Sequence, residues 1–375
     1  MKILTVTKAA LGVGQRKLEE LAAIPGVEQL TLIVPPYWEE PRVGRTYLEK
    51  LYTSGYELIV EPMTLNGNFH LHFYPGLGKW IKRLRPDIVF MEEESFNLAT
   101  AHGSWLAEKY GAVSVFFNWA NTYREYPPPF KNFESYNFKH TAGALAGNDE
   151  ARALLRRRGY AGALAVCPQF GVDTTLFQRC EPPTGFKKPG VFTVGYIGRL
   201  VPEKGLVTPV EACARLKGDF RLVYIGAGPQ KAVIEEAAQR LGIAQKVEFI
   251  PAVSSIEIPA YMSGLDALVL PSLTTSNWKE QFGRVLVEAM ACETPVVGSS
   301  SGEIPYVIGD AGLVFPEGSA LALAENLQKL MDDSTLRTEL AQRGLERVNA
   351  NYTQAQVARR HYDLFAQALN TSKNK

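Results

Sequence analysis

The stretch Leu268-Val-Leu-Pro-Ser272, followed closely by Glu280-Gln-Phe-Gly-Arg-Val-Leu-Val-Glu288, has the pattern of a buried strand, a loop and the start of a helix. Gly283 can open that helix, which leaves Glu280 on the loop and puts Glu288 inside the helix. Both carboxylates then lie near a positive helix N-terminus, where backbone N–H groups bind phosphate while the acids bind sugar hydroxyls. The stretch therefore predicts a nucleotide-sugar site at the end of a strand.

The same alternation of short β-rich runs and longer helical patterns recurs along the whole chain, which is typical of βαβ units in a parallel sheet. It forms two series. The first has strands at 3–7, 29–34, 87–91, 112–117 and 163–167, and the second has strands at 192–197, 220–225, 247–250, 267–270, 295–298 and 313–315. The sequence thus predicts two doubly wound α/β domains of the Rossmann-like kind.

The two series are separated by 178–190, where prolines and glycines interrupt both kinds of element. We place a first domain at 1–180 and a second at 190–350, in agreement with the two domains that 375 residues suggest. A final helical stretch at 353–371 follows. Ligands of doubly wound sheets bind beyond the carboxyl ends of the strands, so the catalytic site is expected in a cleft between the domains.

Composition excludes several classes of protein. Lys and Arg number 40 against 39 Asp and Glu, which leaves a net charge of +1 and no field to attract nucleic acid. The four cysteines are scattered, as expected of buried thiols in a reducing cytosol. No stretch approaches the roughly 18 apolar residues of a membrane span. We expect a cytoplasmic protein, soluble or peripheral to a membrane.

A loop bounded by glycines follows the strand at 192–197. Its sequence is Gly198-Arg-Leu-Val-Pro-Glu-Lys-Gly205, which offers Arg199 and Lys204 at a strand's carboxyl end. Two fixed cations can neutralise a diphosphate leaving group without a metal, and no D-x-D metal clamp occurs in the chain. The alternative is two ordinary surface cations.

Two glycine turns are weaker signals of a phosphate-binding loop. Gly226-Ala-Gly-Pro229 follows the strand at 220–225, and Gly12-Val-Gly14 follows the first strand, so Gly12, Gly14, Gly226 and Gly228 are candidates for donor binding. A dinucleotide fingerprint would need a third glycine where this chain has Lys231, which disfavours an NAD-dependent oxidoreductase. For Gly12-Val-Gly14, the weaker of the two signals, a plain strand-to-helix turn is an equally good explanation.

Together these segments resemble the retaining glycosyltransferases of the two-domain GT-B fold, in particular family 4, whose members belong to the glycosyl transferases group 1. The resemblance is strongest over 191–318. It implies that Arg199 and Lys204 bind the donor diphosphate, that Glu280 faces the hydroxyls of the transferred sugar, and that Glu288 binds the ribose. Other donor contacts are implied at the glycine loop and the helix start, at Gly198, Phe282, Gly283, Arg284 and Val285.

The resemblance also implies an acceptor-binding first domain, a last helix that crosses back onto it, and transfer with retained configuration. The chain departs from the family at three points. Asn118 stands where a His is common, and we take it as a catalytic-site candidate. Glu293 replaces a usual Gly, and Tyr306 replaces a usual acid.

The expected activity is transfer of a hexose from a nucleoside-diphosphate sugar to a hydroxyl acceptor in polysaccharide, glycolipid or small-molecule glycoside synthesis, without metal or other cofactor. UDP-glucose is the first expectation for the donor and GDP-mannose the second. The competing hypotheses are a nucleotide-sugar-binding protein without turnover and, more remotely, the NAD enzyme.

Three stretches of the first half are ambiguous. The pattern of Phe69-His-Leu-His-Phe73 places both histidines on one face of a strand, and Glu92-Glu-Glu94 reads as a solvated turn. The stretch 74–85 mixes Trp, Leu and basic residues, which fits a helix on a membrane surface or an ordinary surface helix with one buried face.

Overall fold

The structure is a computed structural model that describes residues 1–8, 12–40 and 44–373. The chain divides into two compact units. Unit 1 comprises Met1–Gly171 with Gln354–Lys375, and unit 2 comprises Val172–Thr353. The Pro- and Gly-containing stretch 178–190 belongs to unit 2, because Cys180 donates its backbone N–H to the Ser263 hydroxyl and Phe186 packs edge-on against Tyr261.

Unit 1 is built on a seven-stranded parallel sheet with the order β5-β2-β1-β6-β7-β8-β9. Its strands are β1 Lys2–Val6, β2 Gln29–Val34, β5 Glu57–Val60, β6 Ile88–Met91, β7 Val113–Asn118, β8 Gly143–Ala146 and β9 Ala163–Val166. A separate antiparallel hairpin pairs β3 (Tyr37–Glu40) with β4 (Gly44–Tyr47). The strand order reverses between β1 and β6, where Ile3 pairs with Leu30 on one side and Ile88 on the other.

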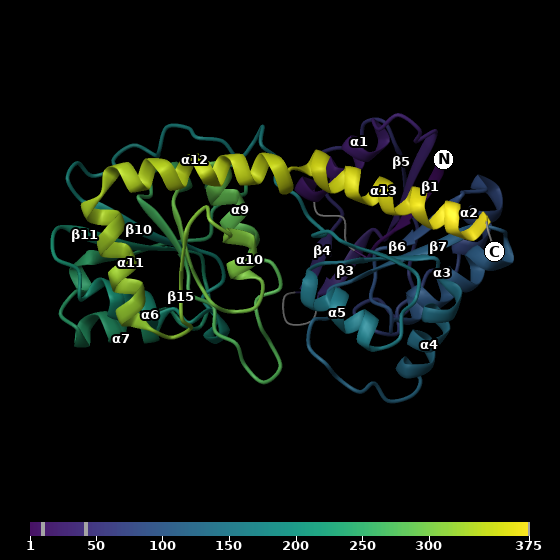
Figure 1. The fold of residues 1–375 in the computed structure, drawn as a ribbon, viewed down its shortest axis with the longest axis horizontal. Coiled ribbons are helices and arrows are strands. Elements are labelled where there is room, and N and C mark those ends of the chain that lie inside the picture. Colours follow the sequence, from purple (N-terminus) through teal and green to yellow (C-terminus); the bar gives the residue numbers. More distant parts are fainter. Residues whose placement is uncertain (9–11, 41–43, 374–375) are drawn as a thin grey trace. The chain divides into compact units, whose positions relative to one another are not determined.

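The helices of unit 1 cover this sheet, and the last of them returns from the far end of the sequence. They are η1 Gly12–Gln15, α1 Arg16–Ala22, α2 Leu77–Leu84, α3 Leu98–Lys109, α4 Phe130–His140, α5 Asp149–Arg157 and α13 Gln354–Lys373. Helix α13, yellow in Figure 1, packs against α1 and strands β7 to β9. Phe365 is buried there with its ring 5.2 Å from that of Phe90. Burial of this apolar face fixes the C-terminal helix on unit 1.

Unit 2 contains a six-stranded parallel sheet with the order β12-β11-β10-β13-β14-β15. Its strands are β10 Phe192–Ile197, β11 Phe220–Ile225, β12 Val247–Ile250, β13 Ala267–Leu270, β14 Val296–Ser299 and β15 Leu313–Phe315. Strands β10, β11, β13 and β14 are almost wholly buried, which explains their continuous apolar runs. The order reverses between β10 and β13, so a crevice is expected at their carboxyl ends.

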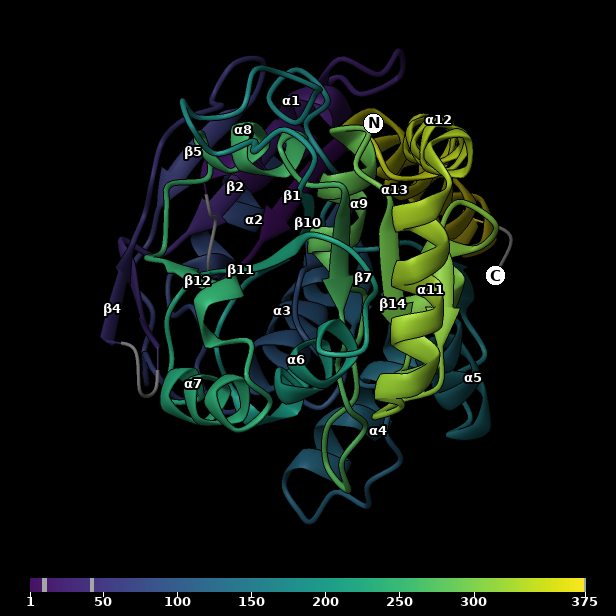
Figure 2. The same ribbon diagram turned by 90° about the vertical axis from the view of Figure 1, so that its left-hand side faces the viewer.

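Helices lie on both faces of this sheet. They are η2 Pro202–Lys204, α6 Val207–Cys213, α7 Lys231–Arg240, η3 Ala244–Lys246, α8 Ile258–Ser263, α9 Arg284–Ala291, α10 Ile304–Ile308, α11 Ala320–Asp332 and α12 Ser334–Asn351. Helix α11 packs against α6 and against β14, as Figure 2 shows. Helix α12 packs against α9, which begins at the site described below.

The predicted strands agree with the structure to within a residue or two, and the doubly wound α/β class is confirmed. Strands β5 and β8 and the β3–β4 hairpin were not predicted; β8 reads Gly-Ala-Leu-Ala, which has low β-propensity. The strand expected at 69–73 is wrong, since this segment consists of turns with a single bridge at Phe73. Within the described residues, no helix combines the length and hydropathy needed to cross a bilayer.

Candidate functional site

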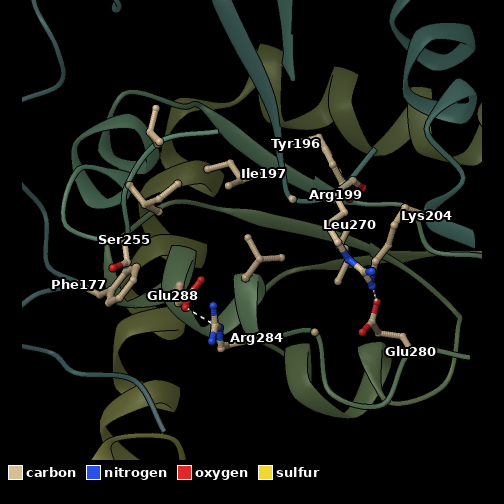
Figure 3. A pocket seen from close by; sticks show the side chains of 15 residues that line it. Phe177, Tyr196, Ile197, Arg199, Lys204, Ser255, Leu270, Glu280, Arg284 and Glu288 are labelled. Atoms are coloured by element: carbon tan, nitrogen blue, oxygen red, sulfur yellow. Dashed lines mark hydrogen bonds and ion pairs between the residues drawn. The ribbon is translucent and has the colours of Figure 1, made fainter. Parts of the chain in front are cut away.

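A pocket of about 560 Å³ lies in unit 2 where the strand order reverses (Figure 3). Tyr196, Ile197 and Gly198 reach it from the end of β10, and Leu270 reaches it from the end of β13. Its size suits a drug-sized or nucleotide-sized ligand, and its place is the one at which open α/β sheets bind ligands.

The loop after β10 brings two cations to this pocket. Arg199 and Lys204 both line it, on the same side as Glu280 in Figure 3. The Tyr196 hydroxyl donates to the Arg199 carbonyl oxygen at 2.8 Å, which ties the loop to the end of β10. Arg199 is exposed, and no acidic side chain of the described part of the chain forms an ion pair with it. Its guanidinium is therefore available to an anionic ligand.

The second glycine turn supports this loop. Gly226 has φ +143°, and a Cβ there would lie 2.0 Å from the carbonyl oxygen of Gly198. A Cβ on Gly228 would lie 2.3 Å from that of Leu200. Neither Gly226 nor Gly228 lines the pocket. The close approach that these glycines allow is to the Arg199 loop itself, so the Gly-x-Gly pattern has a packing reason here.

Lys204 and Glu280 form a mostly buried ion pair. The Lys204 Nζ lies 2.5 Å from Glu280 Oε2, with 15% and 11% of the side chains exposed. The buried Ser272 hydroxyl donates to the same oxygen at 2.8 Å. Lys204 also lies over the Trp278 ring, 4.9 Å from its centroid. The carboxylate is thus held by two donors, which leaves Glu280 Oε1 to accept from a ligand hydroxyl.

Helix α9 begins at the pocket. Gly283 is its N-cap with φ +78°, a conformation that favours glycine, and a Cβ there would contact the Leu270 side chain at 3.0 Å. Gly283, Arg284 and Val285 all line the pocket. The first N–H groups of a helix have no partner within the helix, so this turn presents donors and a positive dipole end to an anion.

One turn further, Glu288 faces the pocket from inside α9, with Arg284 beside it. Arg284 Nε lies 2.9 Å from Glu288 Oε1, and the carboxyl is 12% exposed. Burial raises the pKa of Glu288, and the Arg284 guanidinium partly opposes that rise. Figure 3 shows this pair on the side of the pocket away from Lys204 and Glu280. The arrangement provides two carboxylates with the N-terminus of a helix between them.

The structure brings most of the predicted residues of unit 2 together. The pocket is lined by Gly198, Arg199, Lys204, Glu280, Gly283, Arg284, Val285 and Glu288. Phe282 is buried instead, with its ring 5.7 Å from that of Tyr352. Gly12, Gly14 and Asn118 belong to unit 1 and are described with that unit.

Sequence reasoning missed other residues of the lining, namely Phe177, Tyr196, Ile197, Val253, Ser255, Ile258 and Leu270. Tyr196, Ile197 and Leu270 are the last residues of predicted strands, so the rule of the strands' carboxyl ends could have found them. Phe177 and Ser255 lie in loops far away in the sequence, and only the fold reveals them.

At the carboxyl end of the unit 1 sheet, Asn118 is buried and its amide is engaged. Its Nδ2 donates to the Ala120 carbonyl at 3.1 Å, and its Oδ1 accepts from the Ser95 hydroxyl at 3.4 Å. Any contact of Asn118 with a ligand would have to use its remaining hydrogen-bonding capacity.

The acidic run after β6 is not the solvated turn that the sequence suggested. Glu93 is buried; burial would raise its pKa, but the Lys8 ammonium and His72 outweigh that effect and lower the pKa to about 2. Glu94 accepts from the backbone N–H groups of Trp119 and Ala120, and burial raises its pKa to about 7. The run is part of an internal polar network of unit 1.

No group of three or more His, Cys, Asp and Glu side chains within the described ranges could hold a metal ion.

Comparison with known proteins finds similarity mainly in the C-terminal half of the chain. Residues 181–347 match the family model described as Glycosyl transferases group 1. The chain is 32% identical over 161 residues to 2-deoxystreptamine glucosyltransferase of Streptomyces kanamyceticus, covering 42% of this chain and 40% of that protein. It is 30% identical over 206 residues to a GDP-mannose-dependent alpha-(1-6)-phosphatidylinositol monomannoside mannosyltransferase of Mycobacterium tuberculosis, covering 52% and 53%. The chain thus spans about half the length of these curated relatives.

Solved structures resemble this protein in fold over almost the whole chain. Anabaena Alr3699/HepE in complex with UDP superimposes with a TM-score of 0.73 at 17% identity, covering 98% of this chain and all of that one. At this identity the match shows the fold alone. Two Rossmann-like domains and a C-terminal helix that returns to the first define the GT-B fold. Residues 181–347 thus match the Glycosyl transferases group 1 model, within a chain that has the GT-B fold.

Proposed function

We propose that the protein is a retaining hexosyltransferase that uses a nucleoside-diphosphate sugar, with UDP-glucose as the first expectation and GDP-mannose as the second. One observation carries this proposal. The start of α9 lies between two cation–carboxylate pairs that line the pocket, Lys204–Glu280 and Arg284–Glu288. A diphosphate needs donors and positive charge, and a sugar and a ribose need carboxylate acceptors. The pocket supplies both.

In this proposal the diphosphate binds at the α9 N-terminus with Arg199 and Lys204 beside it. As the bond from the anomeric carbon to the diphosphate oxygen breaks, negative charge develops on the leaving group, and these donors stabilise it. Glu280 positions the sugar through its hydroxyls, and Glu288 binds the ribose. The acceptor hydroxyl forms the new bond on the face that the diphosphate leaves, which retains the configuration. We propose that no metal takes part.

The acceptor is proposed to be a hydroxyl-bearing sugar, lipid-linked or small molecule that binds to unit 1, where Asn118 stays our candidate for a contact with the reacting groups. The names of the relatives describe one enzyme that acts on 2-deoxystreptamine and one that acts on a phosphatidylinositol mannoside. Both soluble and membrane-borne acceptors thus occur among them. We propose that the enzyme acts in the cytoplasm.

Two other functions compete with this one. A nucleotide-sugar-binding protein without turnover would have the same pocket, and an NAD-dependent oxidoreductase would use Gly226 and Gly228 to approach a dinucleotide. The contacts of these glycines with the Arg199 loop disfavour the second hypothesis.

The deciding experiment measures release of free nucleoside diphosphate from UDP-, GDP-, ADP- and TDP-sugars. We expect release from one donor and its loss in Glu288→Ala. A matched control is Glu235→Ala, which removes an exposed carboxylate of α7 outside the pocket. Absence of release with every donor and with a panel of acceptors, together with thermal stabilisation by UDP or GDP, would establish the binding protein instead. Oxidation of NADH with a carbonyl substrate would support the oxidoreductase.

A further inference from the structure

Helix α2 of unit 1 presents a row of cations to solvent. Leu77 and Ile81 are buried, so its apolar face packs on the core. The opposite side carries Lys79, Lys82 and Arg83, all exposed, with Arg85 exposed directly after the helix. Among the described residues, Lys82, Arg83 and Arg85 have no acidic ion-pair partner, whereas Lys79 lies 3.3 Å from Glu61. The helix therefore exposes charge that the protein itself does not neutralise.

The end of helix α3 adds aromatic rings to this basic surface. Trp105 is 48% exposed and Tyr110 is 38% exposed, which is unusual for such large side chains. Lys109 lies between them, with its Nζ 5.0 Å from the Trp105 ring centroid and 5.7 Å from that of Tyr110. The Lys109 ammonium group thus lies near two exposed aromatic rings at once.

The two helices are direct neighbours in unit 1. They pack against each other, as Figure 1 shows, and a Cβ on Gly78 would lie 3.2 Å from Leu106 and 3.9 Å from Tyr110. The absence of a side chain at Gly78 lets the end of α3 approach α2 closely. We call the exposed residues of both segments the α2–α3 surface, which comprises Lys79, Lys82, Arg83, Arg85, Trp105, Lys109 and Tyr110.

Most of the acidic side chains nearby have partners other than these cations. Glu108 lies 2.9 Å from His140 and accepts from the Tyr136 hydroxyl, and Asp87 accepts from the backbone N–H of Lys2. Glu61 is buried and accepts from the Trp80 indole at 2.7 Å. Four cations of the surface, namely Lys82, Arg83, Arg85 and Lys109, have no acidic ion-pair partner among the described residues, in a chain whose net charge is only +1.

We propose that the α2–α3 surface docks the protein onto a bilayer that contains anionic phospholipids. Clustered Lys and Arg are attracted to the negative surface potential of such a bilayer, and Trp and Tyr partition into its interfacial region. Cations alone would suit any polyanion, but the exposed Trp105 and Tyr110 rings beside Lys109 favour an interface with an apolar interior. The inference rests on unit 1 alone and does not depend on the donor pocket.

The test is co-sedimentation of the full-length protein with vesicles. Vesicles of phosphatidylcholine and phosphatidylglycerol in equal parts should bind the protein, and vesicles of phosphatidylcholine alone should not. The double variant Lys82→Glu/Arg83→Glu should lower the partition coefficient at least about tenfold, because each cation contributes severalfold to adsorption on an anionic surface. Trp105→Ala should lower binding as well, and its effect should persist at high salt, where the effect of the charges is screened.

The matched control is Lys329→Glu/Arg343→Glu, which makes the same charge change at exposed positions of unit 2. It should bind as the wild type does. Equal binding to both kinds of vesicle, unchanged binding of the Lys82/Arg83 variant, or an equal loss in the control would overturn the proposal. So would binding to a DNA duplex that matches the vesicles in strength and is insensitive to Trp105→Ala, since this would identify a general polyanion site. All the substituted side chains are exposed, so unchanged thermal midpoints should accompany each result.

Discussion

Lys204 and Glu280 lie 76 residues apart in the sequence, yet their charged groups meet at 2.5 Å in the pocket of unit 2. The contact joins the loop that follows β10 to the loop that precedes α9. One loop offers the cation proposed for the diphosphate, and the other offers the acid proposed for the sugar. The pair therefore links the two halves of the proposed donor site.

Replacing Lys204 by Ala should lower the turnover of the nucleotide sugar on the order of 10²-fold, because the departing diphosphate loses a fixed donor. It also leaves Glu280 without its cation. The rate of nucleoside-diphosphate release measures this effect. Lys231→Ala, which removes a 55% exposed cation outside the pocket, should retain normal turnover. Normal turnover in Lys204→Ala would refute the assignment of the diphosphate.

Ser272 should act as a positioning residue for Glu280, since its buried hydroxyl donates to Glu280 Oε2 at 2.8 Å. Ser272→Ala should lower kcat about tenfold with a small change in KM for the donor, because the acid stays in place but loses an orienting donor. The stability cost should be about 1 kcal/mol. Ser300→Ala, a change at an exposed serine, is the control. If Ser272→Ala lost stability but kept the wild-type kcat, Ser272 would have a structural role only, and the positioning role would be refuted.

Donor affinity should depend on pH through Glu288. Burial raises the pKa of this carboxyl above its ordinary value, so it takes up a proton at a higher pH than an exposed glutamate does. The ionised form accepts from hydroxyls and pairs with Arg284, so KM for the donor should rise as the pH falls through this pKa. Glu288→Gln should have a higher KM that is independent of pH in the same range. A parallel rise in both proteins would assign the effect to another group.

Glu293 is a non-glycine residue with φ +54°, at the position where the related family has Gly. A side chain in the left-handed region costs roughly 1–2 kcal/mol, and a glycine there relieves that strain while making the unfolded chain more flexible. Glu293→Gly should therefore raise the free energy of unfolding by up to about 1 kcal/mol. The thermal midpoint measures this gain, and Glu293→Ala, which keeps the strain, should not produce it.

Stability should also depend on pH through Glu94. Its pKa rises from an ordinary 4.5 to about 7 in the folded protein. Between these values the folded state binds more protons than the unfolded state, so this carboxyl lowers the stability as the pH rises through that window. Glu94→Gln should remove this dependence, a difference of about 3 kcal/mol at most. Thermal midpoints across this pH range test it, with Glu125→Gln as the control at an exposed carboxylate.

The sequence by itself determined the α/β class, most of the strands, and the acids and cations that line the candidate site. These features are local: continuous apolar runs mark buried parallel strands, and Gly283 between Glu280 and Glu288 marks a loop that opens a helix. Each of these predictions uses only the residues of one short segment and needs no information about the segments that pack against it. For the same reason Phe177 and Ser255 could not be found, since their loops carry no local signal.

Tertiary structure decided how those segments are used. Gly226 and Gly228 turn out to pack on the Arg199 loop, and Glu94 is enclosed instead of solvated, because burial and backbone approach are set by contacts between distant segments. The same holds for the α2–α3 surface, whose two helices become neighbours only because α3 packs on Gly78. Side-chain type follows from the sequence, whereas the dielectric surroundings and partners that give it a role follow from the fold.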